Sequence, residues 1–137
     1  MPLDEILEVL RQWIDRAEED LRTAEYILTL EKDCPFGNIC FHAEQCVEKY
    51  LKALLVFKGI DFPKTHNIPE VLALVPPSVR PSLSPEEQEQ LTDYATVLRY
   101  PGEWEPITRE DAEAAVKVAR KVREAVRKLL PYTALNG

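Results

Sequence analysis

The chain has 137 residues, of which 45% are hydrophobic and 30% are charged, and its formal net charge is -7. This length suits one hydrophobic core, so we expect a single domain spanning residues 1–137. The acidic balance does not favour nucleic acid through bulk electrostatics. The four glycines are too few for an all-β fold with many tight turns.

The N-terminus and the cysteines indicate the cellular setting. The segment MPLDEILEVLRQW lacks the basic start and apolar run of a secretion signal, and no segment has the length of a membrane span. Cys34, Cys40 and Cys46 are odd in number, which argues against a disulfide framework. On a helix, Cys40 and Cys46 point about 120° apart, so they cannot bind one metal together. We therefore expect a cytoplasmic protein that uses no membrane, metal or cofactor.

Helical periodicity predicts five helices and no strand. The first two are long and are separated by EKDCPFGN, where Pro35 and Gly37 interrupt the helix. Gly59 is a natural C-terminal stop for the second helix, and Thr65 or Asn67 is expected to cap the short third helix. The predicted ranges are 3–31, 36–58, a short segment ending at residue 75, 85–98 and 109–130.

The last two helices begin with strong capping signals. Ser84 precedes Pro85 and is followed by Glu87, and Thr108 is followed by Asp111 at the same spacing. The proline-rich segment VPPSVRPSLSP before the fourth helix is either a mobile loop or a loop that wraps around the bundle. Short connections favour antiparallel neighbours, so we expect an all-α, up-and-down bundle of four to five helices.

The second helix has two distinct sides. Its apolar side, at 100° per residue, is expected to face the core and comprises Phe36, Cys40, Ala43, Val47, Tyr50, Leu51 and Leu54. Its opposite side comprises Asn38, His42, Gln45, Lys49 and Lys52. Such a polar arc is usual for a solvated helix face, yet Phe41 and Val56 interrupt it. We therefore expect another helix or a second subunit to cover part of this side, with Phe41 and Val56 in the interface.

Charge is distributed unevenly between the first and last helices. Residues 1–31 hold nine acidic and three basic side chains, whereas residues 112–130 hold six basic and two acidic ones. Cations near a helix C-terminus complement its dipole, which is the simplest explanation. Pairing of the two helices by charge is an alternative. A nucleic-acid contact along the last helix is an alternative, but no aromatic residues lie between its basic residues.

Three sequence segments occur in a characteristic order along the chain: WIDRAEEDLRTAEYIL, CFHAEQCVEKYLKALLVFKGIDFPKTHNIPEVL and LTDYATVLRYPGEWEPITREDAEAAVKVARKV. Together they resemble the HEPN family, the higher eukaryotes and prokaryotes nucleotide-binding domain, over nearly the whole chain. The resemblance implies a HEPN-like helical bundle, commonly a homodimer. Many small members of the family are encoded beside a minimal nucleotidyltransferase, and such pairs can act as toxin and antitoxin. Other members look like the helical domain of aminoglycoside nucleotidyltransferases.

Many HEPN proteins are metal-independent ribonucleases, marked by an Arg, a gap of four to six residues and a His on or near the last long helix. The positions that would hold this Arg are Pro35, Phe36 and Gly37 before His42, and Gly59, Ile60 and Asp61 before His66. The predicted last helix contains no His. The ribonuclease signature is therefore absent, and with it the expected general acid or base.

The predicted function is binding of a nucleotide or RNA, of a minimal nucleotidyltransferase partner, or of both, within a toxin–antitoxin-type pair. The residues expected at the site are His42, Gln45, Lys49, Lys52, Thr65, His66, Arg99 and Tyr100. Cationic and hydrogen-bonding side chains suit phosphate, although His66, Arg99 and Tyr100 are also placed to cap helices or fix a loop. Two alternatives stay open. One is a metal-independent endoribonuclease with an unconventional site such as His42 with Arg99, and the other is a non-catalytic dimerisation module.

Overall fold

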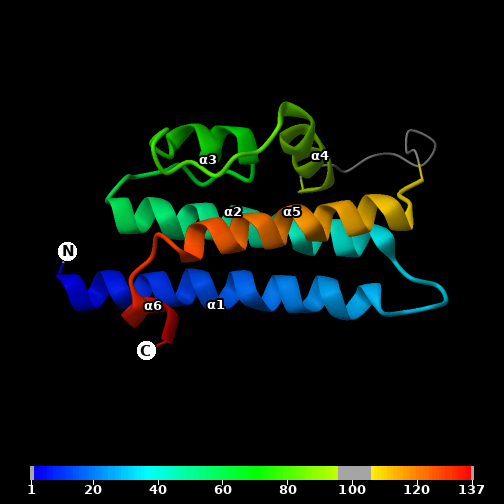
Figure 1. Ribbon diagram of the computed structural model, residues 1–137, viewed down its shortest axis with the longest axis horizontal. Helices are drawn as coiled ribbons and strands as arrows, with labels where there is room; N and C mark the ends of the chain where they lie inside the picture. Colours follow the sequence, from blue (N-terminus) through cyan, green and yellow to red (C-terminus); the bar gives the residue numbers. More distant parts are fainter. Residues whose placement is uncertain (1, 96–105, 137) are drawn as a thin grey trace.

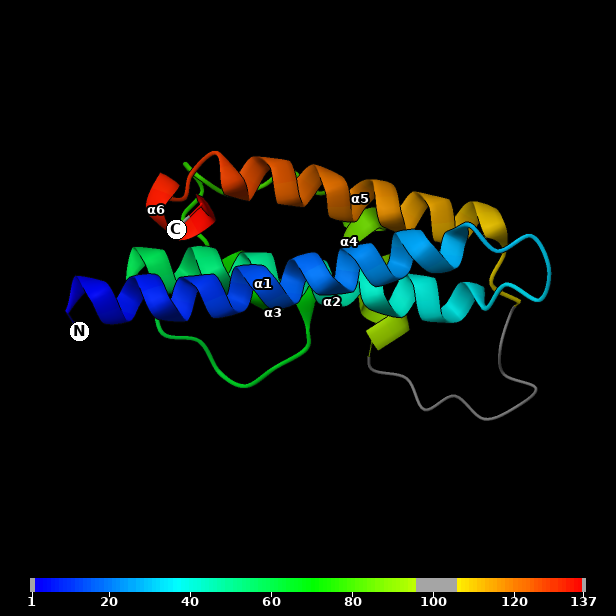
Figure 2. The ribbon, with the colours of Figure 1, turned by 90° about the horizontal axis from the view of Figure 1, so that it is seen from below.

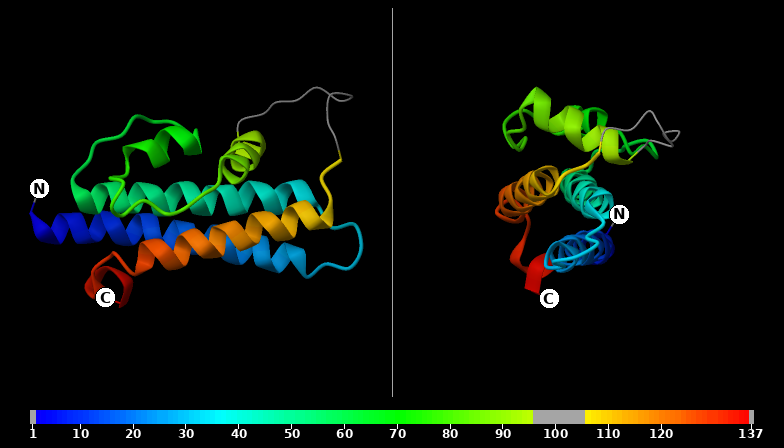
Figure 3. Two further views of the ribbon diagram at one scale, coloured as in Figure 1. Left: turned by 45° about the horizontal axis from the view of Figure 1, so that its top comes forward. Right: turned by 90° about the vertical axis from the view of Figure 1, so that its right-hand side faces the viewer.

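The computed structural model describes residues 2–95 and 106–136, in which there are six helices and no strand. This result confirms the predicted all-α bundle. The body of the molecule consists of three long helices, α1 (Leu3–Leu28), α2 (Phe36–Lys58) and α5 (Arg109–Arg127). Figure 1 shows that α1 and α2 form an antiparallel pair and that α5 runs in the same direction as α2. Seen end-on, the three helices form a triangle (Figure 3).

The shorter helices lie on opposite sides of this body. α3 (Ile68–Leu74) and α4 (Pro85–Ala95) cover α2 on the side away from α1 (Figures 1 and 3). The connector of residues 59–67, between α2 and α3, extends to one side of the α1–α2 pair (Figure 2). α6 (Tyr132–Asn136), which the sequence did not predict, turns back onto the first half of α1. There the guanidinium of Arg11 donates to the carbonyl oxygen of Thr133 at 3.0 Å.

Most helix ends follow the predicted caps. Gly59 ends α2 in the left-handed conformation, with φ of 69°, which glycine adopts without steric cost. Both predicted capping boxes, at Ser84 and at Thr108, are formed. Asn67 caps α3, because its side-chain oxygen accepts a backbone N–H of the first turn at 3.0 Å. Thr65 instead accepts the backbone N–H of Asn67 at 3.1 Å.

Two helices end earlier than predicted, for identifiable reasons. α1 stops at Leu28, where Arg109 of α5 donates to the carbonyl oxygens of Leu28 and Leu30 at 3.2 and 3.0 Å. There the backbone tightens, since the N–H groups of Thr29 and Leu30 donate to the carbonyl oxygens three residues before them at 3.1 and 3.0 Å. α5 stops at Arg127, after which the chain tightens through a hydrogen bond from Leu129 to the carbonyl of Val126 at 2.9 Å. The predicted end of the fourth helix, residue 98, lies outside the described residues.

α2 is the central helix of the hydrophobic core. Its predicted apolar side is fully buried except for the half-buried Phe36. Large buried side chains from the neighbouring helices pack against it, namely Leu10, Ile14, Leu21, Ile68, Val71, Val116 and Val122. Each such burial stabilises the fold by about 1.5–3 kcal/mol. The predicted stripe therefore fixes how α2 is rotated and places its polar side towards α1 and the connector.

Polar contacts also join the long helices. Arg120 pairs with Glu25 at 2.9 Å, and Glu18 accepts from Arg123 at 2.6 Å and from the hydroxyl of Tyr50. The alternative of pairing between the first and last helices by charge is therefore confirmed. Burial, together with the hydrogen bond to Glu18, raises the pKa of Tyr50. This network connects α1, α2 and α5 through a single carboxylate.

The proline-rich loop wraps around the bundle, which was one of the two alternatives for it. The guanidinium of Arg80 donates to the carbonyl oxygens of Val75 and Ala73, at 2.8 and 3.2 Å, at the end of α3. Leu83 is buried. The loop, α3 and α4 surround a cavity of about 410 Å³.

Candidate functional site

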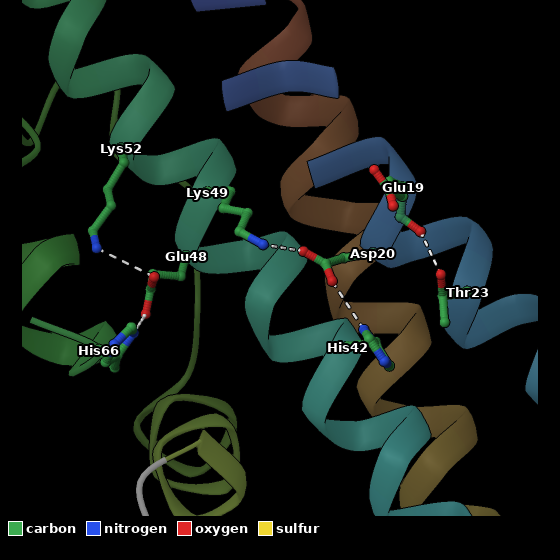
Figure 4. Close-up of polar contacts among 8 residues, drawn as sticks. All are labelled: Glu19, Asp20, Thr23, His42, Glu48, Lys49, Lys52 and His66. Atoms are coloured by element: carbon green, nitrogen blue, oxygen red, sulfur yellow. Dashed lines mark hydrogen bonds and ion pairs between the residues drawn. The ribbon is translucent and has the colours of Figure 1, made fainter. Parts of the chain in front are cut away.

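The polar side of α2 carries two clusters centred on carboxylates (Figure 4). The Asp20 cluster consists of Asp20, His42 and Lys49, and it joins α1 to α2. The Glu48 cluster consists of Glu48, Lys52 and His66, and it joins α2 to the connector. Four of the predicted site residues are therefore divided between two separate clusters.

In the Asp20 cluster, each carboxylate oxygen has one donor. Nδ1 of His42 donates to Oδ1 at 2.9 Å, and Nζ of Lys49 donates to Oδ2 at 2.5 Å. The Asp20 side chain is 12% exposed, whereas those of His42 and Lys49 are 29% and 22% exposed. Donation from Nδ1 leaves Nε2 of His42 available to a ligand. A carboxylate that fixes an imidazole in this way sets both its orientation and its tautomer.

The local sequence explains how this cluster forms. His42 and Lys49 are seven residues apart, so they lie two turns apart on the same side of α2. Helical side chains tilt towards the N-terminus, so Lys49 reaches back towards His42. Asp20 projects between them from α1, and it is the buried acidic residue of that helix.

The Glu48 cluster is more enclosed. Nζ of Lys52 lies 3.2 Å from Oε2 of Glu48, and Nδ1 of His66 lies 2.9 Å from Oε1. The Glu48 and Lys52 side chains are 3% and 7% exposed, whereas the His66 side chain is 64% exposed. The cluster is therefore a buried ion pair with a histidine at its surface.

Further contacts explain why Lys52 is enclosed. Its Nζ donates to the carbonyl oxygen of Thr65 at 2.8 Å and lies 5.7 Å from the ring centroids of both Trp13 and Phe62. An ammonium near aromatic faces is stabilised by their quadrupoles. Lys52 therefore holds the connector onto α2, and few of its N–H groups remain for a phosphate.

The remaining predicted residues do not all converge on one site. Gln45 is half-buried on the same side of α2, and the hydroxyl of Thr65 donates to Glu70 at 3.3 Å. Arg99 and Tyr100 lie outside the described residues. Sequence reasoning missed the two carboxylates, Asp20 and Glu48, on which the clusters depend.

The predicted interface residues lie far apart. Phe41 is exposed, with its ring edge-to-face against the His42 ring at 5.3 Å between centroids, and Val56 is half-buried. Fifteen residues of helix separate them, which is roughly 22 Å along the axis. They therefore form two separate apolar spots.

The cysteines are structural, and the described residues offer no metal site. Cys40 is buried, as its place on the predicted apolar side of α2 requires, Cys46 is buried as well, and Cys34 is half-buried. Burial raises the pKa of Cys46, and the charges of Glu18 and Asp20 raise it further. Within residues 2–95 and 106–136, no group of three His, Cys, Asp or Glu side chains is placed to hold a metal ion. No helix in the same part of the chain is long and apolar enough to cross a membrane.

The fold and the polar side of α2 define the class of protein. It is an all-α bundle whose central helix presents His42, Lys49 and Lys52 paired with carboxylates, and the connector adds His66. A family model described as the HEPN domain matches residues 10–129. The chain therefore belongs to the HEPN family, and the resemblance found in the sequence is confirmed.

Similar proteins include one curated sequence and two solved structures. A protein of Methanocaldococcus jannaschii described as "Putative toxin MJ1304" is 34% identical over 134 residues, covering 86% of each chain. The crystal structure of TT1696 from Thermus thermophilus has a TM-score of 0.71 at 29% identity, covering 88% of this chain and 98% of that one. ST0689, described as an archaeal HEPN homologue, has a TM-score of 0.67 at 26% identity, covering 88% and 96%.

Proposed function

We propose that this chain is the toxin-like member of a two-protein pair and that its Asp20 cluster binds a nucleotide. The nucleotide is either free or presented by a partner with a minimal nucleotidyltransferase fold, and the proposed location is the cytoplasm. The description of the Methanocaldococcus jannaschii relative as "Putative toxin MJ1304" supports the first part. The convergence of His42 and Lys49 on one largely buried carboxylate supports the second part.

The chemistry of this cluster suits a phosphate oxygen. Lys49 has three N–H groups, of which Asp20 takes one, and the ammonium remains partly exposed. Protonated His42 offers Nε2–H as a second donor, while Asp20 keeps its ring in place. Hydrogen bonds between charged donors and phosphate are about twice as strong as neutral ones. In contrast, Lys52 is enclosed and is proposed to support the site without touching the ligand.

Isothermal titration with ATP and with GTP tests the proposed nucleotide site. We expect His42→Ala and Lys49→Ala to weaken binding at least tenfold, because each removes one charge-assisted hydrogen bond. Lys58→Ala is the matched control, since it removes an exposed lysine at the end of the same helix. Arg99→Ala tests the sequence prediction for that residue. If the wild-type protein does not bind at millimolar nucleotide, or if the control loses as much affinity, the proposal is wrong.

The partner is tested by a separate measurement. Co-expression with the product of an adjacent reading frame that carries the nucleotidyltransferase pattern is expected to yield a complex that co-elutes with this chain. Relief of growth arrest by that product would support the toxin assignment. Absence of growth arrest when this chain is expressed alone would contradict it.

A metal-independent endoribonuclease is the second candidate, and the His42–Asp20 pair favours it. A carboxylate-oriented imidazole is suited to general-base catalysis. Nε2 of His42 would take the proton of a ribose 2′-hydroxyl as its oxygen attacks the adjacent phosphorus, and the 5′-oxygen would leave with a proton from water. Incubation with total RNA in EDTA tests this: His42→Ala should abolish cleavage and His66→Ala should retain it. If the wild-type protein does not cleave RNA, this candidate is excluded.

A homodimer that contacts through the polar side of α2 is also proposed. The exposure of Phe41 and the partial exposure of Val56 support it, because both leave apolar surface accessible on α2. Light scattering after size-exclusion chromatography tests it with Phe41→Glu and Val56→Glu separately. If both variants keep the mass of a dimer, neither residue lies in the interface.

A further inference from the structure

The polar side of α2 contains one aromatic ring that the phosphate chemistry above does not use. Phe41 is 40% exposed. Its neighbours one turn away on either side are Asn38 and Gln45, and His42 follows it directly. An exposed ring flanked by amide and imidazole side chains offers both a stacking surface and hydrogen-bonding groups to a planar polar ligand.

The ring of Phe41 has a defined orientation. Its centroid lies 5.3 Å from that of His42, at an interplanar angle of 76°. Asp20 fixes His42, and His42 packs edge-to-face against Phe41, so the orientation of the Phe41 ring is restrained while the side chain stays exposed.

Two amide side chains flank this ring. Asn38 is exposed and Gln45 is half-buried, and neither side chain has a hydrogen-bond partner among the described residues. Asn38, Phe41, His42, Gln45 and Lys49 all lie within about 100° of the helix circumference, by standard helical geometry. Asn38 and Gln45 are about 10 Å apart along the axis, so an amide lies on each side of a base stacked on Phe41. An Asn or Gln amide recognises adenine by donating to N7 and accepting from N6.

The local charge complements the phosphate of the same ligand. The single charge of Asp20 faces both Lys49 and His42. Arg16 lies one helical turn before Asp20 on α1, is exposed and has no ion pair among the described residues. Because α1 runs antiparallel to α2, Arg16 lies towards the Lys49 end of the Asp20 cluster. Lys49 and Arg16 therefore favour a phosphate at that end, in a chain whose net charge is -7.

We propose that Phe41 is the base-stacking platform of the nucleotide site and that Asn38 and Gln45 select adenine. This inference rests on the proposed nucleotide-binding function and names the base that the site takes. The ligand is an unpaired adenine nucleotide, either free or within single-stranded RNA. Stacking on one aromatic side chain contributes enough to change affinity by roughly tenfold or more.

Binding measurements with AMP, GMP, CMP, UMP and ribose 5-phosphate test this inference. We expect AMP to bind most tightly and ribose 5-phosphate at least tenfold more weakly. Phe41→Ala should weaken AMP binding about tenfold and leave ribose 5-phosphate unchanged, whereas Phe41→Trp should preserve the AMP affinity. Gln45→Ala should reduce the preference for AMP over UMP. Phe57→Ala is the matched control, because Phe57 is 37% exposed on the same helix but lies at its other end.

The outcomes separate the base preference from the nucleotide site itself. Equal binding of AMP and ribose 5-phosphate, both weakened by Lys49→Ala, would overturn the stacking inference and leave the proposed nucleotide site intact. No binding of any of these ligands would overturn both. If Phe41→Ala changes the mass in light scattering and leaves AMP binding unchanged, Phe41 is a subunit contact and the inference is wrong. Oligoadenylate and oligouridylate of six nucleotides then distinguish RNA from free nucleotide: tighter binding of oligoadenylate than of AMP assigns the adenine to RNA.

Discussion

The Asp20 cluster and the Glu48 cluster contain the same three kinds of side chain, a carboxylate, a lysine and a histidine, yet they differ in burial. In the Asp20 cluster the carboxylate is nearly buried, and both of its partners are partly exposed. In the Glu48 cluster the carboxylate and the lysine are both enclosed, and the histidine alone is exposed. The Glu48 cluster, whose lysine is enclosed, therefore stabilises the fold. The Asp20 cluster contains the same kinds of side chain, but its lysine is accessible and can contact a ligand.

The difference arises from the neighbours of each lysine. Lys52 lies near two aromatic rings and beneath the connector, whose carbonyl oxygen at Thr65 accepts its hydrogen bond. Lys49 meets the edge of α1, where it donates to Asp20. A buried charge that loses its partner is costly, whereas a partly exposed one turns to water. Substitutions in each cluster test whether this difference in burial separates the two roles.

The largest expected effect is the loss of stability on removing Glu48. Glu48→Ala leaves the ammonium of Lys52 enclosed without a counter-charge, and breaking such a buried pair costs about 3–5 kcal/mol. Urea denaturation followed by circular dichroism measures the change in the free energy of unfolding. A loss below about 1 kcal/mol would show that Lys52 escapes to solvent and that the cluster is not a structural ion pair.

The double variant Glu48→Leu with Lys52→Met is the control for this prediction. It removes both charges and keeps apolar volume, a replacement that is often neutral or stabilising for buried pairs. We expect it to recover most of the stability lost in Glu48→Ala. Failure to recover would assign the loss to packing and not to the unpaired charge.

The second expected effect is a smaller loss of stability on substituting Asp20. Asp20→Asn keeps the shape of the side chain and removes its charge, and both partners are exposed enough to be hydrated. We therefore expect a loss of about 1 kcal/mol in the free energy of unfolding, the net contribution of a typical intramolecular hydrogen bond. The same urea measurement applies. A loss equal to that of Glu48→Ala would remove the proposed distinction between the clusters.

The sequence predicted the scaffold better than it predicted these clusters. The periodicity of α2 and the caps at Gly59, Ser84 and Thr108 are local signals, and local backbone chemistry decides them. The sixth helix was missed because its five residues follow Pro131, which reads as a helix stop.

The clusters depend on contacts that are only partly local. The Glu48–Lys52 pair has the spacing of neighbours on a helix and was open to prediction. Asp20 is one of nine acidic residues in the first 31, and nothing in its local sequence marks it as the buried one. Its burial depends on how α1 is rotated and how closely it packs on α2. Both are set by the packing of all the core side chains together. The same reason explains why Lys52 was predicted as a ligand contact, whereas the structure encloses it beside Trp13 and Phe62.

The third expected effect is local and concerns the connector of residues 59–67. His66→Ala removes the hydrogen bond between the connector and Glu48. The hydrogen bond from Lys52 to the carbonyl oxygen of Thr65 remains and still holds the connector on α2. We expect global stability to change by less than about 1 kcal/mol, since the His66 side chain is largely exposed. Amide hydrogen exchange across the connector should accelerate a few-fold, because local opening becomes easier.

His42→Ala is the matched control for this prediction, because it removes the corresponding histidine of the Asp20 cluster. Its connector amides are expected to exchange as in the wild-type protein. Equal acceleration in both variants would mean that the two clusters are coupled through α2 and do not act separately.

The smallest expected effect is the response of the two clusters to salt. At 1 M ionic strength the Debye length is about 3 Å, so partly exposed charges are screened and enclosed ones are screened much less. The stability cost of Asp20→Asn should therefore fall by a few tenths of a kcal/mol between about 0.05 M and 1 M sodium chloride, and that of Glu48→Ala should stay constant within error. Urea titrations of the wild-type protein and both variants at the two salt concentrations provide the comparison. An equal salt response would mean that water and ions reach Lys52 as readily as Lys49. Burial would then no longer explain why Lys52 stabilises the fold whereas Lys49 is proposed to bind the ligand.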